Sequence, residues 1–388
     1  MPEQYLHGVE VIEAVSGNRP IQTTKSSVIG IVGTAPDADA TAFPLNTPVL
    51  ISGNRTEAAN LDLVGTGEGS LPAALAGIFD QVGAAVVVVR VDVGVDDAAT
   101  QINVIGGIAG NGDYEGLEAL LAAESVLAVQ PRLICAPGFS DTQTVAAAME
   151  IIADKLSAIA VVDCANTTTA DAQTYIANFG DRVFGIYPWV TVAASGGNVD
   201  EPASARVCGV IAKTDNDLGF WHSPSNKQIK GIVGTSKPID FKLGDATSRA
   251  NVLNENNVAT IIQQNGFRLW GNRTASLDPK WAFVSVRRTA DIINDSLQRA
   301  HMWAVDRNIT KNYAEEVAEG VNSYLRTLKS LGAIIGGVCW PDPDLNTPTN
   351  IQAGKIYFNF DFTVPSPAEK VTFTSMLVND YYKEISES

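Results

Sequence analysis

The chain alternates between short runs of apolar residues and stretches in which apolar residues recur at helical spacing. The apolar runs are typical of strands buried on both faces, and they lie at residues 28–32, 48–51, 84–91, 132–136, 158–164 and 183–187. The helical stretches lie at residues 71–82, 114–124, 141–157, 169–178 and 203–216. This alternation predicts an α/β fold with a doubly wound parallel sheet covered by helices on both faces.

The pattern changes after the last of these helices. A turn-rich aromatic segment at residues 219–226 is followed by short strands and by two long helical stretches, at 290–306 and 310–331. Thr289 and Thr310 precede the two stretches, and threonine is a common N-cap residue. The last third of the chain is therefore predicted to form a second domain of the α+β type.

Three further runs are strand-like. Residues 355–362 and 370–374 lie near the end of the chain, and the alternating run Gly8-Val9-Glu10-Val11 lies near its beginning. The N-terminal run has no hairpin partner nearby, and an unpaired strand presents N–H and C=O groups that bind the edge of another sheet. Pairing within the subunit and pairing with a neighbouring chain both remain open for the terminal runs.

Composition narrows the class of protein. The 388 residues allow two or three domains, and 45% hydrophobic with 18% charged residues is ordinary for a globular chain. No apolar run approaches the ~18 residues of a membrane span, and the start MPEQY lacks the features of a secretory signal. The net charge of −16 argues against direct nucleic-acid binding, which requires clustered Lys and Arg. We therefore expect neither membrane insertion nor a nucleic-acid partner.

Four cysteines lie far apart without CxxC spacing: Cys135, Cys164, Cys208 and Cys339. Three of them lie in apolar or strand-like stretches, where free cysteine behaves as a small hydrophobic residue. We expect structural thiols, which fits folding in a reducing cytoplasm, with metal or redox roles as the alternative.

Catalytic and cofactor motifs are not found in the sequence. The nearest match to a dinucleotide fingerprint, Gly30-Ile31-Val32-Gly33, lacks the GxGxxG spacing, and there is no GxxxxGK[ST] loop. His7, His222 and His301 lie far apart, without HExxH or a GxSxG elbow in the chain. We therefore assign no catalytic, cofactor-binding or metal-binding residue and expect no enzyme activity.

Several segments rich in aromatic and basic residues are unusual for loops. The most specific is Arg268-Leu269-Trp270-Gly271-Asn272-Arg273-Thr274, and Phe220-Trp221-His222-Ser223-Pro224-Ser225-Asn226 precedes it. Further segments lie at residues 7–9, 26–30, 281–284, 287–289, 303–310 and 342–346. Together they closely resemble the tail sheath proteins of contractile phages and R-type pyocins, in order and over nearly the whole chain.

The resemblance implies a structural subunit. Such subunits polymerise as helically stacked rings around an inner tube, and contraction drives the tube through the target cell envelope. It implies as partners further copies of the chain, the inner tail tube protein, and baseplate and tail terminator proteins. The implied location is the tail of a virion or phage-like particle, assembled in the bacterial host cytoplasm. Alternatives are the sheath of a related secretion or antifeeding apparatus and, from another class, a nucleotide-binding α/β enzyme.

The resemblance also implies a division of the chain into an N-terminal arm (1–25), an outer α/β domain (26–250), an inner tube-facing domain (251–368) and a C-terminal strand and arm (369–388). The extended arms are expected to add strands to neighbouring subunits. The residues expected to pair in this way are Val9, Glu10, Val11, Val371, Thr372, Phe373 and Thr374.

One stretch of this acidic chain is basic. Residues 268–311 hold eight Lys and Arg against four Asp and Glu, and they lie in the part assigned to the inner domain. We therefore expect some bases of this domain to face an acidic tube, with Lys311, Arg326 and Lys329 as candidates. The alternative is pairing within the subunit with Asp291, Asp295 and Asp306.

Overall fold

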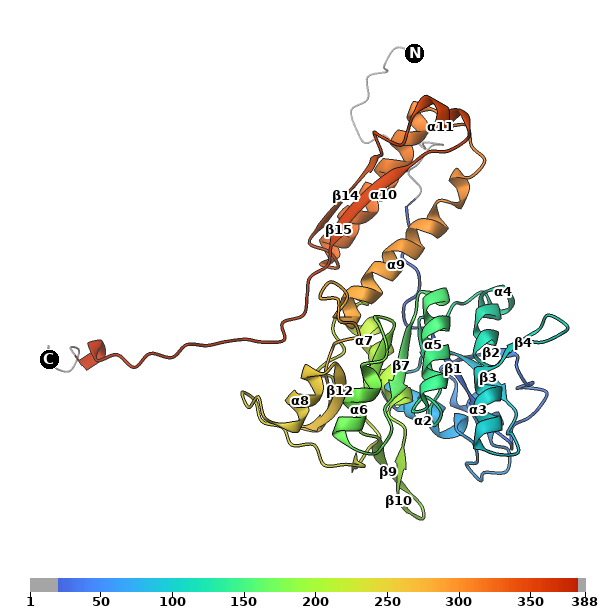
Figure 1. The fold of residues 1–388 in the computed structure, drawn as a ribbon, viewed down its shortest axis with the longest axis vertical. Coiled ribbons are helices and arrows are strands. Elements are labelled where there is room, and N and C mark those ends of the chain that lie inside the picture. Colours follow the sequence, from blue (N-terminus) through green and yellow to red (C-terminus); the bar gives the residue numbers. More distant parts are fainter. Residues whose placement is uncertain (1–19, 383–388) are drawn as a thin grey trace, which may run out of the picture.

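The computed structural model describes residues 20–382, which form two modules along one long axis (Figure 1). The sheet module comprises residues 26–283 and the helix-pair module residues 284–363. The strands of the sheet module are β1 (Ile29–Thr34), β2 (Pro48–Ser52), β3 (Ala85–Val91), β4 (Gly107–Ile108), β5 (Tyr114–Glu115), β6 (Leu133–Cys135), β7 (Ile159–Asp163), β8 (Val183–Ile186), β9 (Val190–Ala194), β10 (Gly197–Glu201), β11 (Gly234–Thr235), β12 (Val258–Gln263) and β13 (Phe267–Trp270). Its helices are α1 (Arg55–Ala58), η1 (Ala59–Leu61), α2 (Leu71–Gln81), α3 (Asp97–Ile105), η2 (Gly116–Ala122), α4 (Ala123–Leu127), α5 (Gln143–Leu156), α6 (Thr169–Ile176), α7 (Ser204–Leu218) and α8 (Arg249–Glu255).

An eight-stranded sheet forms the middle of the sheet module, in the order β13-β12-β8-β7-β6-β1-β3-β2. The strands from β12 to β3 are parallel, whereas the edge strands β13 and β2 run antiparallel to their neighbours. The predicted α/β class is confirmed, but the sheet is mixed rather than purely parallel. Strand β13 is antiparallel because only residues 264–266 separate it from β12, too few for a parallel crossover.

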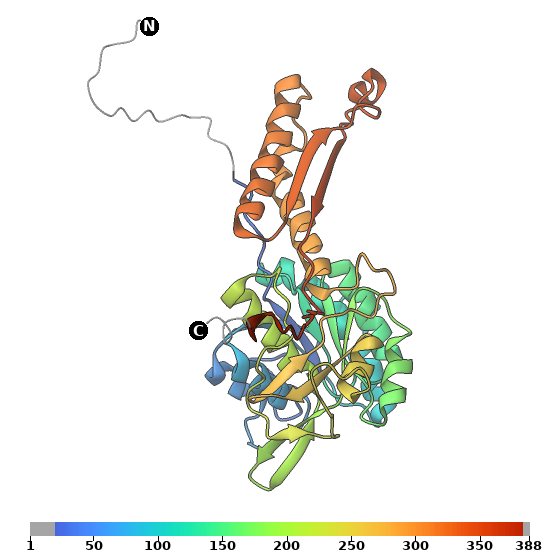
Figure 2. The same ribbon diagram turned by 90° about the vertical axis from the view of Figure 1, so that its left-hand side faces the viewer.

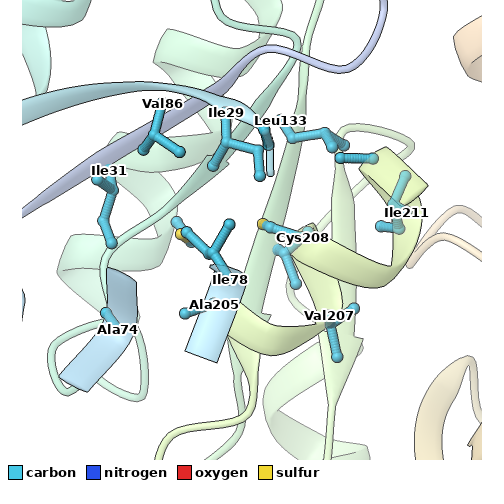
Figure 3. Close-up of a cluster of buried hydrophobic side chains, with 14 of the residues drawn as sticks. Ile29, Ile31, Ala74, Ile78, Val86, Leu133, Ala205, Val207, Cys208 and Ile211 are labelled. Carbon is cyan, nitrogen blue, oxygen red and sulfur yellow. The ribbon is translucent and has the colours of Figure 1, made fainter. Parts of the chain in front are cut away.

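Successive residues of the central strands feed two hydrophobic cores, one on each face of the sheet. On one face Ile29, Ile31 and Val86 pack against helices α2 and α7 (Figure 3). On the other face Val87 and Val89 belong to a second core, to which α3, α5 and α6 contribute. The six predicted strands of this part are all present. The stretch predicted as a helix at 114–124 contains the 3-10 helix η2 and the start of α4 instead of one α-helix.

The large sheet continues past residue 250, where we expected the outer domain to end. Helix α8 and strands β12 and β13 follow that position, and β12 pairs with β8 through Val258↔Gly185 and Ala259↔Ile186. This pairing joins segments far apart in the sequence, so the change of local pattern after residue 215 does not reveal it. Residues 251–283 accordingly belong to the sheet module.

The helix-pair module contains α9 (Val284–Ala300), η3 (Met302–Ala304), α10 (Lys311–Leu331), β14 (Gly336–Pro341), α11 (Pro348–Gln352) and β15 (Phe358–Thr363). Strands β14 and β15 form an antiparallel pair beside α10 (Figures 1 and 2). The core between the helices and this pair includes Ile293, Val321 and Leu325, and Phe220 of the sheet module packs into it. The aromatic segment at 219–226 thus links the two modules.

The expected helix ends are correct for α10 and wrong for α9. The Thr310 hydroxyl accepts a hydrogen bond from the Tyr313 N–H at 3.2 Å, and Gly332 ends the helix in the left-handed region. Thr289 lies inside α9, which begins at Val284. The four cysteines are buried free thiols. Within residues 20–382 no helix is long and apolar enough to cross a membrane.

Candidate assembly surfaces

The chain beyond β15 is an extended segment that projects from the body of the molecule (Figure 1). Residues 364–379 form no helix or strand, so the predicted strand at Val371, Thr372, Phe373 and Thr374 has no partner within the described chain. Val371 is 69% exposed and Phe373 91% exposed, and Met376 and Leu377 continue the apolar surface. Exposed apolar side chains on an extended backbone are typical of a segment that binds another chain.

The N-terminal candidates Val9, Glu10 and Val11 lie outside the described residues. The segment that follows them, residues 20–25, lies on the helix-pair module. The Thr24 N–H donates to the Ser296 hydroxyl at 3.1 Å, and the Thr23 and Tyr324 hydroxyls are 3.2 Å apart. The N-terminal segment therefore reaches the body of the subunit along α9 and α10.

The β14–β15 pair has one open edge. Asn322 of α10 occupies the outer edge of β14, because its side chain accepts from the Cys339 N–H at 2.7 Å and donates to the Cys339 carbonyl at 3.0 Å. The alternation of an antiparallel ladder directs the backbone groups of Phe358, Phe360 and Phe362 away from β14, and within residues 20–382 no strand pairs with them. The outer edge of β15 can therefore accept a strand from another chain.

The three tube-facing candidates lie on one exposed side of α10. Lys311 and Lys329 are 18 residues apart, or five helical turns, and Arg326 lies one turn before Lys329. Lys311 approaches Glu315 at 3.7 Å, and Arg326 pairs with Glu319. These are exposed surface pairs, so the side chains remain available to a partner.

Most other bases of the 268–311 stretch pair within the subunit. Helix α9 lies against the sheet module through a seam of ion pairs: Arg288–Asp215 (2.6 Å), Arg182–Asp291 (2.5 Å), Arg287–Asp181 (3.3 Å), Arg132–Asp295, and Arg299–Glu124 (2.5 Å). Two acids of the alternative expectation, Asp291 and Asp295, thus hold bases of their own subunit. Asp306 makes no ion pair within the described chain. The seam fixes the orientation of the two modules.

Within residues 20–382 no three His, Cys, Asp or Glu side chains come together in a group that could hold a metal ion. Asp163, at the end of β7, is a buried carboxyl group that is only 1% exposed. Its carboxylate accepts from the Ala203 N–H at 2.7 Å and the Ser204 N–H at 2.8 Å, at the beginning of α7. Burial raises the pKa of Asp163 to about 6, opposed by the hydrogen bonds from Ser204, Ala203 and Ser140. A carboxylate so enclosed holds a helix end in place.

Sequence reasoning missed one ion pair beside the arm. Glu369, which precedes the exposed segment, accepts two hydrogen bonds from the Arg273 guanidinium, at 2.8 and 2.6 Å. These hydrogen bonds raise the pKa of Arg273. Arg273 belongs to the segment 268–274 that carries the strongest family resemblance, but its partner lies 96 residues away and no local pattern connects them.

Three family models match consecutive parts of the chain. The Tail sheath protein Gp18 domain III N-terminal region matches residues 26–91, the Phage tail sheath protein central domain residues 109–275, and the Phage tail sheath C-terminal domain residues 276–377. The last two meet at residue 275, close to the boundary between the two modules.

Known relatives are similar over their full length. The chain is 44% identical to a putative prophage major tail sheath protein of Pseudomonas aeruginosa (strain UCBPP-PA14), over 98% of both chains. It is 37% identical to the tail sheath protein of Escherichia phage P2, over 99% of this chain and 98% of that one.

At 19% identity its fold matches a solved sheath of an extracellular contractile injection system, the PVC sheath complex in the contracted state, with a TM-score of 0.71 over 98% of this chain and 100% of that one. At 18% identity the fold also matches the helical sheath of the anti-feeding prophage in the contracted state, with a TM-score of 0.72 over 95% of this chain and 98% of that one. The chain therefore belongs to the phage tail sheath family.

Proposed function

We propose that copies of this chain polymerise as helically stacked rings around an inner tube and that contraction of the polymer drives the tube through the target envelope. The observation that carries the proposal is that one subunit presents two complementary unpaired surfaces. The extended apolar segment at Val371–Thr374 needs a strand edge, and the outer edge of β15 is unpaired. Addition of this segment from each copy to the β15 edge of the next copy links the subunits into a continuous network.

The setting we propose is the tail of a virion or phage-like particle. The full-length relatives above are a phage and a prophage protein, which favours a phage tail over a secretion or antifeeding apparatus. Further proposed partners are the inner tail tube protein, the baseplate and the tail terminator, with assembly in the bacterial host cytoplasm. We propose a structural role without catalysis, as the family is a structural one.

The energy for contraction would come from two packings of the same subunits that bury different areas. Burial of apolar surface stabilises by about 25 cal/mol per Å², so a few hundred Å² more per subunit amounts to several kcal/mol. Summed over many copies, such a difference drives mechanical work without a nucleotide.

The test compares polymers of the full chain with those of a chain that ends at residue 369. We expect striated hollow tubes from the full chain in negative-stain electron microscopy, and their loss in the truncation. Val371→Ser/Phe373→Ser should act like the truncation, because the two side chains lie on one side of the added strand. Thr372→Ser/Thr374→Ser changes the other side conservatively and serves as the control. Normal tubes from the truncated chain would contradict the proposed role of the arm.

A further inference from the structure

The segment between β15 and the free arm is held at its two ends. Val364 packs against the core of the helix-pair module, and Glu369 pairs with Arg273 of the sheet module. Within the described chain, the hydrogen bonds of Glu369 are the only ones made by residues 365–378. Pro365 and Pro367 lie between the two anchors and restrict the backbone.

Arg273 is itself firmly placed. Its backbone forms an isolated antiparallel bridge with Phe283, and its guanidinium lies 5.5 Å from the centre of the Phe283 ring. Gly271, two residues earlier, approaches strand β12 so closely that a Cβ there would lie 2.7 Å from the Ala259 Cα. The segment that carries the strongest family resemblance thus presents a fixed guanidinium fork, which binds a carboxylate bidentately.

We propose that the Arg273–Glu369 pair is a clamp that fixes where the C-terminal arm leaves the subunit and in which direction it points. With the clamp closed, the arm becomes free at Lys370 on the surface of the sheet module, instead of at the end of β15 on the helix-pair module. Opening would free residues 365–369 and lengthen the tether by about 17 Å, at ~3.4 Å per residue. A longer tether lowers the effective concentration of the arm at its target edge.

This inference rests on the proposed role of the arm in polymerisation, but its first measurement does not. A spin label attached at Ser366→Cys reports the mobility of the anchored segment in the isolated full-length subunit. The label attaches selectively at this position because the four native cysteines are buried. We expect Glu369→Gln to increase the mobility of the label, and the charge-swapped pair Arg273→Glu/Glu369→Arg to restore it. Asp217→Asn removes the carboxylate of an exposed pair with Lys213 on α7 and is the matched control. Equal mobility in Glu369→Gln and the unchanged chain would overturn the clamp.

The second measurement is the rate of polymerisation. We expect Glu369→Gln to slow polymerisation by up to about fivefold, because an exposed ion pair rarely changes an equilibrium constant by more than this factor. The charge-swapped pair should recover the original rate. An unchanged rate despite a more mobile label would overturn the positioning role. If the chain ending at residue 369 polymerises normally, the arm itself is dispensable and the proposed function fails. If that truncation does not polymerise but Glu369→Gln does so at the normal rate, only the clamp inference fails.

Discussion

Asp163 joins a strand of the central sheet to the helix that covers it. Its Oδ1 accepts from two N–H groups at the beginning of α7, where the helix dipole favours a negative charge. Its Oδ2 accepts from the hydroxyls of Ser140, at 3.3 Å, and Ser204. These bonds favour the carboxylate, yet complete burial penalises it more and raises the pKa of Asp163 to about 6.

We predict a pH-dependent difference in stability between the unchanged chain and Asp163→Asn. The folded pKa of about 6 lies above the unfolded value, so folding favours the protonated acid. The resulting stabilisation is complete below about pH 4, is lost as the pH rises through about 6, and amounts to about 3 kcal/mol. Asparagine has no such titration. Urea unfolding of the two chains at several pH values should therefore show the unchanged chain losing stability relative to the variant as the pH rises, and parallel curves would contradict the argument.

Thr289 and Thr310 illustrate what residue type predicts at a helix end. Both are threonines before a long amphipathic stretch, and only Thr310 caps its helix. Thr289 is fully buried inside α9, where its hydroxyl donates to the Ser285 carbonyl at 2.7 Å. The sequence alone does not distinguish a threonine whose buried hydroxyl bonds to a carbonyl of its own helix from one that caps the helix. The difference depends on which side of the helix is packed.

Among the secondary-structure elements, α9 carries the connection between the modules. Arg288 and Asp215 have side chains only 5% and 2% exposed, and Arg288 also donates to the Ser26 carbonyl at 3.0 Å. The ion pairs of Asp291 and Asp295 continue this contact along the helix. Buried pairs of this kind add little net stability compared with apolar packing, but loss of one partner leaves an uncompensated charge.

We predict that Asp215→Asn lowers the free energy of unfolding by about 3–5 kcal/mol, because it leaves the Arg288 guanidinium buried without a counterion. The exposed pair Lys213–Asp217 on the same helix provides the control, and Asp217→Asn should cost less than about 1 kcal/mol. Urea unfolding measures both. Equal, small effects in the two variants would mean that the seam is hydrated in solution and does not fix the modules.

The elements themselves were largely predictable, whereas their pairing was not. Apolar runs such as 84–91 and 158–164 identify central strands, because burial on both faces leaves no polar alternation. The position of β12 beside β8 depends on residues far apart in the chain, and so the local pattern does not predict that the large sheet continues past residue 250. The run at 370–374 has a strand pattern, but a strand also needs a partner, and the described chain offers none. The family was identified from the resemblance of specific segments, whereas the strands and helices were predicted from the pattern of apolar residues.

The whole molecule is acidic, and its basic residues are distributed unevenly along the chain. The formal net charge is −16, and residues 268–311 hold eight bases against four acids. The structure shows that Arg287, Arg288 and Arg299 of this stretch pair with acids of the sheet module, Asp181, Asp215 and Glu124 respectively. On the exposed side of α10, Lys311 and Arg326 stand in exposed ion pairs, which are weak. If a tube surface is held electrostatically, α10 is the element of the helix-pair module best suited to hold it.

We predict that Lys311→Glu/Arg326→Glu/Lys329→Glu weakens co-assembly with the tube protein, and that added salt weakens it in the unchanged chain as well. Exposed charges interact over a Debye length of about 8 Å at physiological ionic strength, so contacts of this kind grip a tube and still allow it to slide. Co-sedimentation of sheath with preformed tubes at several salt concentrations measures the effect.

The matched control carries the same change in charge on exposed bases of the sheet module that make no ion pair within residues 20–382, Lys230→Glu/Lys242→Glu/Lys280→Glu. This control should bind the tube like the unchanged chain, because its substitutions lie outside α10. Polymerisation without the tube separates the two possible roles of α10. If the α10 variant polymerises normally alone and loses only the tube, its bases face the tube. If it fails to polymerise alone, the same side of α10 contacts a neighbouring subunit, and the tube-facing assignment of Lys311, Arg326 and Lys329 is wrong.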